Sequence, residues 1–158
     1  MDWKRAVLGE MEDDRAVVLF DGECNLCNGS VNFLIDRDAK GKLLFASQQS
    51  PVGEKFMRHH GIVTNLDTLA MVHQGRVYLH STAVIRTIAH MGGVWRPVLA
   101  FLLVPAVFRD FCYARVAGNR YRFFGRKAES CRVFTPDTKR RFLQFNEEAR
   151  DRFVPKDD

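Results

Sequence analysis

Two cysteines separated by two residues, Cys24 and Cys27, are the side chains in this 158-residue chain best suited to chemistry. With that spacing, one sulfur can attack a disulfide while the other stays close enough to resolve the mixed disulfide that forms. A C-x-x-C pair near a β-α-β pattern is typical of a thiol–disulfide redox site. The pattern therefore predicts a dithiol that opens and closes, with Cys24 as the nucleophile and Cys27 as the resolving thiol.

The elements that must position the thiols can be predicted from their flanks. Residues 17–20 form a short apolar and β-branched run, which predicts a buried strand. From Cys27 the apolar residues recur at Val31, Leu34 and Ile35, the stripe of a helix that packs on a sheet. Cys24 is therefore expected at the first helical turn, where unpaired N–H groups and the helix dipole favour a thiolate. Cys27 is expected one turn in, on the apolar face.

Asp21 stands three residues before Cys24, at the end of the predicted strand. A partly buried carboxylate there can accept the proton of Cys27 during resolution, as a general base. Asp-Gly is also good turn chemistry, so the carboxylate can instead bind exposed N–H groups of the loop, and both alternatives stay open. Glu23 is expected to be solvated, and its charge opposes thiolate formation at Cys24. The residues expected to line the substrate site are Gly22, Glu23, Asn25, Leu26, Thr68 and Ser81. Ser81 also suits the cap of a helix.

The succession of elements predicts the fold. The first helix is predicted to end at about Asp38, and a strand at 43–46 and a helix from Ser50-Pro51 to Gly61 follow it. Two strands at 68–72 and 77–80 are then joined by a turn that contains Gly75. A helix from Ser81 to Gly92-Gly93 comes last. The first two strands are expected to pair in parallel and the last two antiparallel. This order predicts a thioredoxin-like α/β fold, a βαβ-α-ββα sandwich with a C-terminal helical extension. We expect a single domain: a lead-in at 1–14, a redox core at 15–93 and the extension at 94–158.

The extension is predicted to be helical. One helix starts near Pro97, breaks before Pro105 and continues to Gly118-Asn119, and a last helix opens at Thr135-Pro136-Asp137, anchored by Phe142 and Phe145. The apolar run from Pro97 to Phe108 is about half the length needed to span a bilayer. We expect it to pack as a buried helix, with contact to a membrane surface as the alternative. Cys112 is expected to be a small buried residue in this helix.

The composition of the chain limits the classes of protein to which it can belong. The chain is 46% hydrophobic and 27% charged, as in folded soluble domains, and residues 1–14 lack an apolar signal core. We therefore expect a cytoplasmic protein with no bound metal or cofactor. Four cysteines in a reducing compartment do not suit a structural disulfide framework. A zinc site is the alternative for the C-x-x-C pair, but its other ligands would have to come from Cys131, Cys112 or a histidine. Cys131 is either a third redox thiol or a packing residue.

Positive charge is concentrated in one segment. Residues 109–132 hold seven Lys/Arg against two acids, which equals the net charge of +5 of the whole chain. Its basic patch comprises Arg120, Arg122, Arg126 and Lys127, interleaved with Tyr121, Phe123 and Phe124. Basic and aromatic residues together can bind nucleic acid, and a binding module is therefore the alternative function. We favour aromatic residues that anchor the extension to the core, with arginines that pair with acids or select an acidic partner protein.

These residues resemble the DCC family of thiol–disulfide oxidoreductases, named for the motif D-x-x-C-x-x-C, here Asp21, Cys24 and Cys27. The similarity runs from about Val17 to Phe134, and includes His80-Ser81-Thr82-Ala83 and the segment 119–126 followed by Cys131. The resemblance implies reduction of disulfides in protein or small-molecule substrates, with an electron donor that regenerates the dithiol. Thioredoxins have a cis-proline before the third strand, whereas residues 65–68 hold none here. Docking of the substrate backbone as in thioredoxin is therefore not expected.

Overall fold

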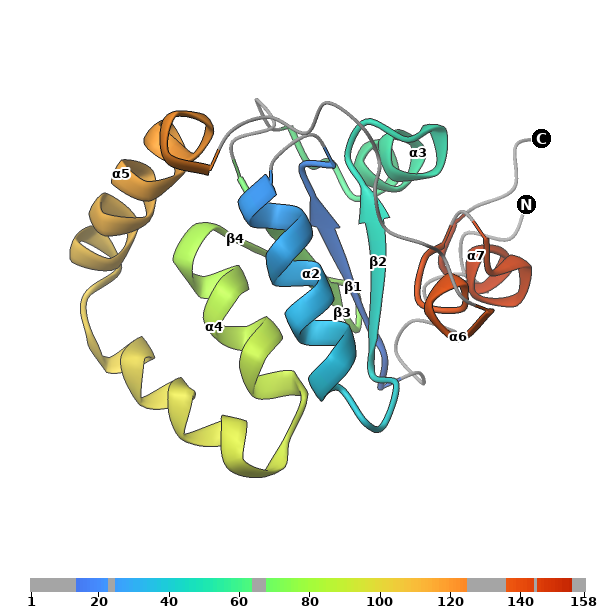
Figure 1. Cartoon of the computed structure of the whole chain (residues 1–158), viewed down its shortest axis with the longest axis horizontal. Coiled ribbons are helices and arrows are strands. Elements are labelled where there is room, and N and C mark those ends of the chain that lie inside the picture. The colour runs from blue at the N-terminus through green and yellow to red at the C-terminus, as the bar shows by residue number, and fades with distance from the viewer. Residues whose placement is uncertain (1–13, 23–24, 64–67, 125–135, 144, 155–158) are drawn as a thin grey trace.

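The computed structural model describes residues 14–22, 25–63, 68–124, 136–143 and 145–154. Its elements follow in the order β1 (Ala16–Phe20), α2 (Asn25–Arg37), β2 (Leu43–Ser47), α3 (Pro51–His59), β3 (Ala70–His73), β4 (Arg76–Leu79), α4 (His80–His90), the 3-10 helix η1 (Gly93–Leu103), α5 (Ala106–Phe124), α6 (Pro136–Lys139) and α7 (Glu147–Phe153). Figure 1 shows the sheet at the centre of the molecule, with helices on both sides.

The four strands form one mixed sheet in the order β2-β1-β3-β4. β1 and β2 are parallel, whereas β3 is antiparallel to both β1 and β4. The β3–β4 hairpin is closed by a two-residue turn, because His73 pairs with Arg76. Gln74 and Gly75 in this turn have positive φ values of 49° and 73°, which match the primed turn that hairpins favour. The predicted thioredoxin-like α/β fold is confirmed.

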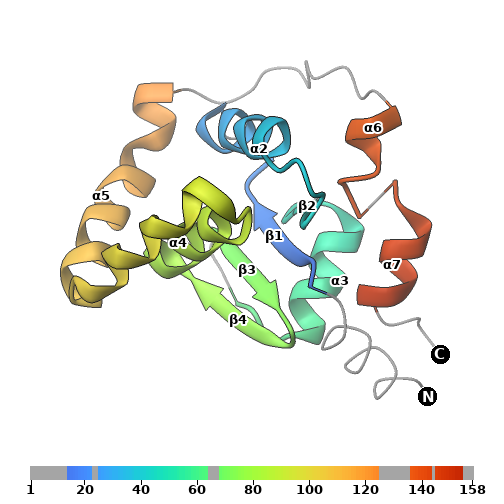
Figure 2. The ribbon, with the colours of Figure 1, turned by 90° about the horizontal axis from the view of Figure 1, so that it is seen from below.

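Each face of the sheet has its own hydrophobic core, because successive strand residues point to opposite faces. Val17 and Leu19 of β1 pack with Phe56 of α3 and Phe153 of α7. The alternate β1 residues, Ala16, Val18 and Phe20, pack with residues of α2 and α4. Figure 2 shows α2 and α4 on one side of the sheet and α3 on the other. The result is the predicted sandwich, in which α2 and β1 contribute to the same hydrophobic core.

Local signals predicted the middle elements closely. Ser50 caps α3 by accepting the Gly53 N–H at 3.0 Å, and Pro51 is its first residue, as predicted. Ser81, however, is not a helix cap. α4 begins at His80, with Leu79 at the N-cap position and no side-chain capping bond. The Ser81 hydroxyl instead donates to Asp110 of α5. The prediction was wrong because a distant residue offers the hydroxyl a stronger, charged acceptor.

The C-terminal segment packs against the outer edge of the sheet, where Phe142 and Arg141 contact β2 and the loop before it. Phe142 bridges Phe45 of β2 and is buried. The Arg141 guanidinium pairs with the fully buried Asp38 carboxylate at 2.6 Å and donates to the Leu43 carbonyl at 3.1 Å. The predicted anchoring by Phe142 is confirmed, whereas Phe145 is 46% exposed. The segment also forms two short helices, α6 and α7, rather than one.

The predicted burial of the segment from Pro97 to Phe108 is wrong. η1 has no buried residue, and α5 continues past Gly118 to Phe124. Large apolar side chains are exposed along both helices, and we call this set the apolar face: Val94, Phe101, Leu103, Val104, Val107, Phe108, Phe111, Val116 and Phe123. η1 and α5 follow the outer side of α4 and extend beyond the sheet, so no described element lies over these residues (Figure 1).

Among the described residues, no single helix is long and apolar enough to cross a membrane. η1 and Ala106–Asn119 are long and apolar enough to cross a membrane only when they are taken together, and the two helices are bent by 112° relative to each other. The break falls at Pro105, as the sequence predicted.

Candidate functional site

The predicted site residues converge on one edge of the sheet. β1 and β2 are parallel, so the residues that follow them, Asp21-Gly22 and Gln48-Gln49, meet at the same edge. β3 runs the other way, so Thr68 precedes it at this edge, and β4 ends there at Leu79. A hydrogen bond of 2.6 Å from the Gln48 amide to the Thr68 carbonyl joins these loops directly. We call this end of the sheet the thiol edge, because α2 also begins here.

Cys27 lies in the first turn of α2, which starts at Asn25. Its side chain is half-buried and packs against the core between the sheet and α2. Val31 and Leu34 continue this buried stripe along the helix, as the sequence predicted. Cys24 and Glu23 lie outside the described residues, as do the side chains of Asn25 and Leu26. Cys27 is the third residue of α2, so it lies in the first turn rather than one turn into the helix as predicted, and it faces the core as expected.

Asp21 is the residue that leaves β1, and only 2% of it is exposed. Its Oδ1 accepts a hydrogen bond of 2.5 Å from the Gln49 amide. The following residue, Gly22, donates its N–H to Gln49 Oε1 at 2.9 Å and accepts at its carbonyl from Asn28 of α2 at 2.8 Å. The buried carboxylate and the start of α2 are thus held in one hydrogen-bonded unit. The Gly22 N–H is therefore bound by the Gln49 side chain and not by the Asp21 carboxylate.

Gln49 is the residue at this edge that sequence reasoning missed. Its amide group serves three neighbours: Asp21, Gly22 and the Ser47 hydroxyl, which donates to Oε1 at 2.8 Å. A signal was present in the polar run of residues 47–50, directly after a strand expected to lie parallel to β1. Since parallel neighbours end at one edge of a sheet, those polar side chains had to lie beside Asp21.

Gly22 is required by a close approach of the backbone. A Cβ atom at this position would lie 2.6 Å from the Ser47 hydroxyl oxygen and 3.3 Å from the Ser47 Cβ. Neither neighbour is the end of a long, flexible side chain. The Asp-Gly pair therefore brings β1 and the β2–α3 loop closer together than any other residue in place of Gly22 allows.

α5 closes the thiol edge from the side of α4. The Tyr113 hydroxyl accepts the Leu69 N–H at 2.7 Å, just before β3. Ser81, 8% exposed, donates to the Asp110 carboxylate, and Arg109 donates to the hydroxyls of Ser81 and Thr82 at 3.1 Å each. Ser81 therefore faces α5. Thr68 is half-buried, with its hydroxyl 3.4 Å from His80 Nδ1.

The remaining predicted residues divide in two groups. Cys112 is exposed on α5, so its predicted burial is wrong, because that part of the helix extends beyond the core. Phe123 is 74% exposed and does not anchor the extension as expected. Arg122 is also exposed. Cys131, Arg126, Lys127 and the side chains of Arg120, Tyr121 and Phe124 lie outside the described residues.

Comparison with known proteins places the chain in a family. A profile of the DCC1-like thiol-disulfide oxidoreductase family matches residues 18–126, which include all of the sheet except the first two residues of β1, and the thiol edge. The chain is 44% identical over 128 residues to the uncharacterized protein YuxK of Bacillus subtilis, covering 80% of this chain and 93% of that protein. It is 37% identical over 137 residues to the chloroplastic DCC family protein At1g52590 of Arabidopsis thaliana, covering 84% of this chain and 78% of that protein. No solved structure matches the chain. The chain therefore belongs to the DCC1-like thiol-disulfide oxidoreductase family.

Proposed function

We propose that this protein reduces disulfide bonds in protein substrates with a Cys24–Cys27 dithiol. The Cys24 thiolate attacks one sulfur of the substrate disulfide, forming a mixed disulfide and releasing one substrate thiolate. The Cys27 thiolate then attacks the Cys24 sulfur and releases the second substrate sulfur as a thiolate, which takes up a proton from solvent. Two electrons pass to the substrate, and the protein is left with a Cys24–Cys27 disulfide. An external thiol or dithiol donor restores the reduced form, so the cycle requires no bound cofactor and suits a reducing compartment such as the cytoplasm.

The position of Cys27 is the observation that carries this proposal. It lies in the first turn of a helix that leaves a buried parallel strand, and it packs half-buried against the core. Cys24 comes three positions earlier in the sequence, directly before the first residue of α2. Free N–H groups at the N-terminus of a helix stabilise a thiolate. That arrangement suits an attacking thiol at Cys24 and a shielded one at Cys27. Membership of the family supports the same chemistry.

Asp21 is proposed to accept the proton of Cys27 when Cys27 attacks the mixed disulfide. A general base must stay in place through the cycle, and the Gln49 amide fixes this carboxylate at the β1–α2 junction. Its burial keeps bulk water from the site. Asp21→Asn keeps the shape of the side chain but removes the base. We expect it to slow release of the second substrate thiol more than formation of the mixed disulfide.

Cysteine variants test the assigned roles. Cys27→Ser should accumulate the mixed disulfide with a substrate, whereas Cys24→Ser should form none. Cys112→Ser is the matched control, because Cys112 is an exposed thiol on α5 and should leave the cycle unchanged. Mixed disulfides can be identified by mass spectrometry after acid quenching. Trapping by Cys24→Ser but not by Cys27→Ser would reverse the roles, and full activity of both variants would refute the proposal.

The apolar face favours a protein substrate over a small disulfide. Soluble monomers rarely expose apolar patches of this kind without a binding role, and α5 lies against both α2 and α4 beside the thiol edge. Exposed arginines on the same helix, Arg115 and Arg122, favour a substrate with an acidic surface. We therefore propose that the part of the apolar face on α5 holds the substrate protein while its disulfide reaches the thiols.

Charge substitutions on this face separate docking from chemistry. Phe108→Glu and Phe111→Glu place carboxylates on side chains that are 66% and 59% exposed, so the fold should be unaffected. We expect KM for a protein disulfide such as insulin to rise about tenfold, from loss of ~1.4 kcal/mol of binding. The rate with hydroxyethyl disulfide should stay constant. Val63→Glu is the control, since Val63 is 92% exposed but lies outside the apolar face. Equal effects on both substrates would contradict docking at this face.

A further inference from the structure

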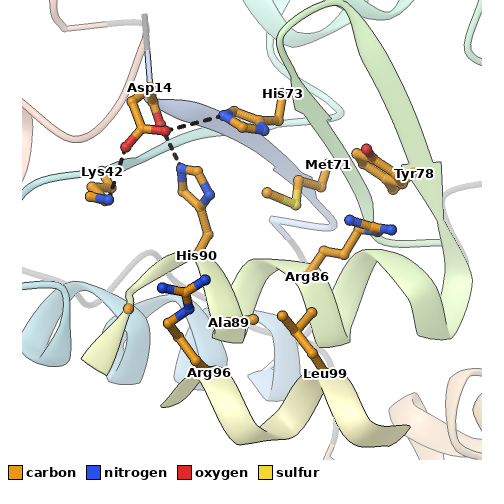
Figure 3. Close-up of a pocket in the computed structure, with 11 residues that line it drawn as sticks. Asp14, Lys42, Met71, His73, Tyr78, Arg86, Ala89, His90, Arg96 and Leu99 are labelled. Atoms are coloured by element: carbon orange, nitrogen blue, oxygen red, sulfur yellow. Dashed lines mark hydrogen bonds and ion pairs between the residues drawn. The ribbon is translucent and has the colours of Figure 1, made fainter. Parts of the chain in front are cut away.

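A pocket lies at the edge of the sheet opposite the thiol edge (Figure 3). Its volume is about 330 Å³, at the lower end of the range for small-molecule sites. Asp14 precedes β1, His73 ends β3 and His90 ends α4, whereas Asp21 and Cys27 follow the far end of β1. Five strand residues span roughly 16 Å, so this pocket is separate from the thiols. Its lining residues include Lys42, Met71, Tyr78, Arg86, Arg96 and Leu99.

The walls of this pocket carry excess positive charge. The Lys42 ammonium pairs with the Asp14 carboxylate at 2.8 Å, and these two opposite charges offset each other at one side of the opening. Arg86 and Arg96 then remain as lining cations. Burial, followed by the charge of the nearby His90, lowers the pKa of His73, so its imidazole is neutral at pH 7. The electrostatic character of the pocket therefore suits an anion.

Nε of Arg86 is a buried atom in the lining that makes no hydrogen bond. Nε2 of His73 is also buried, and it lies 3.6 Å from the Asp14 carboxylate. The Nε–H of an arginine can only donate, so what it lacks is an acceptor, and a buried donor without one costs stability. The guanidinium of Arg86 lies over the Tyr78 ring, 4.5 Å from its centre, which fixes the group in place. An oxygen atom of a bound ligand would accept this hydrogen bond from the Arg86 Nε–H.

A metal ion is the competing occupant of the same walls. Ligand atoms of Asp14, His73 and His90 lie within 4.8 Å of one another. Lys42, however, already holds the Asp14 carboxylate, and His90 Nε2 lies 2.6 Å from the Asp14 backbone oxygen. A divalent cation would displace both contacts and would sit beside two arginines. Guanidinium groups cannot coordinate a metal ion, but they can donate hydrogen bonds to an anion. We therefore favour an anion as the ligand of this pocket.

We propose that this pocket binds a small molecule bearing a phosphate or carboxylate group. Arg86 and Arg96 hold the oxyanion, and His73 supplies a further polar contact. Met71, Tyr78 and Leu99 form the apolar surface against which the organic part of the molecule lies. The site is distinct from the proposed dithiol chemistry and does not depend on it.

Thermal unfolding of the full-length protein with inorganic phosphate or succinate, at constant ionic strength, tests this proposal. A ligand that binds only the folded state raises Tm in a saturable way. Arg96→Gln changes an exposed side chain and should fold normally, and we expect it to weaken binding about tenfold. Arg86→Gln should weaken binding similarly. Arg140→Gln, at an exposed arginine outside the pocket, should not. Tighter binding of phosphate or of succinate identifies which oxyanion the site prefers.

Asp14→Asn separates the anion from the metal. It removes a negative charge, so phosphate or succinate should bind as tightly as to the unsubstituted protein, or more tightly. Zn²⁺ should give no stabilisation that depends on Asp14. The proposal is overturned if neither anion raises Tm in a saturable way, if Arg96→Gln binds like the unsubstituted protein, or if Zn²⁺ stabilises the protein and Asp14→Asn abolishes that effect.

Discussion

Replacing Gln49 with leucine should disrupt the thiol edge more than any other single change to an uncharged residue there. Leucine is similar in size but can neither donate nor accept a hydrogen bond. The substitution leaves the buried Asp21 carboxylate without its amide donor and the Gly22 N–H without its acceptor. It also removes the acceptor of the Ser47 hydroxyl.

The size of the effect follows from these contacts. A hydrogen bond to a charged group contributes about 1.5–3 kcal/mol, and a backbone N–H left without a partner in a part-buried site costs roughly 1–3 kcal/mol. Ser47 can turn its hydroxyl to another acceptor, so we assign it nothing. Allowing for relaxation, Gln49→Leu should lower the free energy of unfolding by about 3 kcal/mol. The β1–α2 junction should loosen with it, so disulfide reduction should slow as well.

Urea unfolding of four proteins measures this prediction: the unsubstituted chain, Gln49→Leu, Asp21→Asn and the double variant. If the Gln49 amide acts through the Asp21 charge, the two substitutions should be non-additive by about 1–2 kcal/mol. A loss below about 1 kcal/mol for Gln49→Leu, or additivity within about 0.5 kcal/mol, would refute the reasoning.

Three further predictions concern other parts of the fold. Gly22→Ala should destabilise the protein by about 1–3 kcal/mol in urea, because its Cβ would lie 2.6 Å from the Ser47 oxygen; an unchanged midpoint contradicts this. Phe142→Ala should cost about 3–5 kcal/mol, since the ring is buried against Phe45, whereas Phe145→Ala, at a 46% exposed site, should stay within about 0.5 kcal/mol; equal costs would show that Phe142 does not anchor the segment. Burial lowers the pKa of His73 from its usual 6.5, so the unfolded chain takes up a proton there before the folded chain does as pH falls. Stability should therefore decline from pH 7 towards pH 5, and His73→Asn should flatten that slope; an unchanged slope would rule out His73 as its source.

The sequence predicted the sheet and its helices because their signals are local. The apolar run of β1, the helical stripe from Cys27 to Leu34 and the Ser50-Pro51 start of α3 each depend on neighbours within one element. The hairpin turn at Gln74-Gly75 is likewise determined by its own backbone. The parallel and antiparallel pairing followed from the order of these elements, without knowledge of any side-chain contact.

The failures concern what a residue contacts rather than what element it forms. The spacing of apolar residues in 97–108 correctly predicted a helical segment, but the predicted burial of that segment was wrong. Periodicity does not show whether another element covers the face of a helix. Phe108 and Cys112 are exposed for that reason. Ser81 was misjudged and Gln49 was overlooked because their partners, Asp110 and Asp21, are 29 and 28 residues away in sequence. Such contacts depend on tertiary structure and leave little local trace.

A redox titration of the two thiols in glutathione or dithiothreitol buffers tests the central claim most directly. Each sample is quenched with an alkylating agent, and the modified cysteines are located by mass spectrometry. The account predicts that Cys24 and Cys27 convert together and reversibly between a dithiol and an intramolecular disulfide. A reductase should have a midpoint near that of thioredoxin, about −270 mV, whereas a midpoint near about −120 mV would indicate an oxidant. Thiols that stay reduced across the whole range, or a Cys24 that pairs only with another cysteine, would contradict the proposed dithiol.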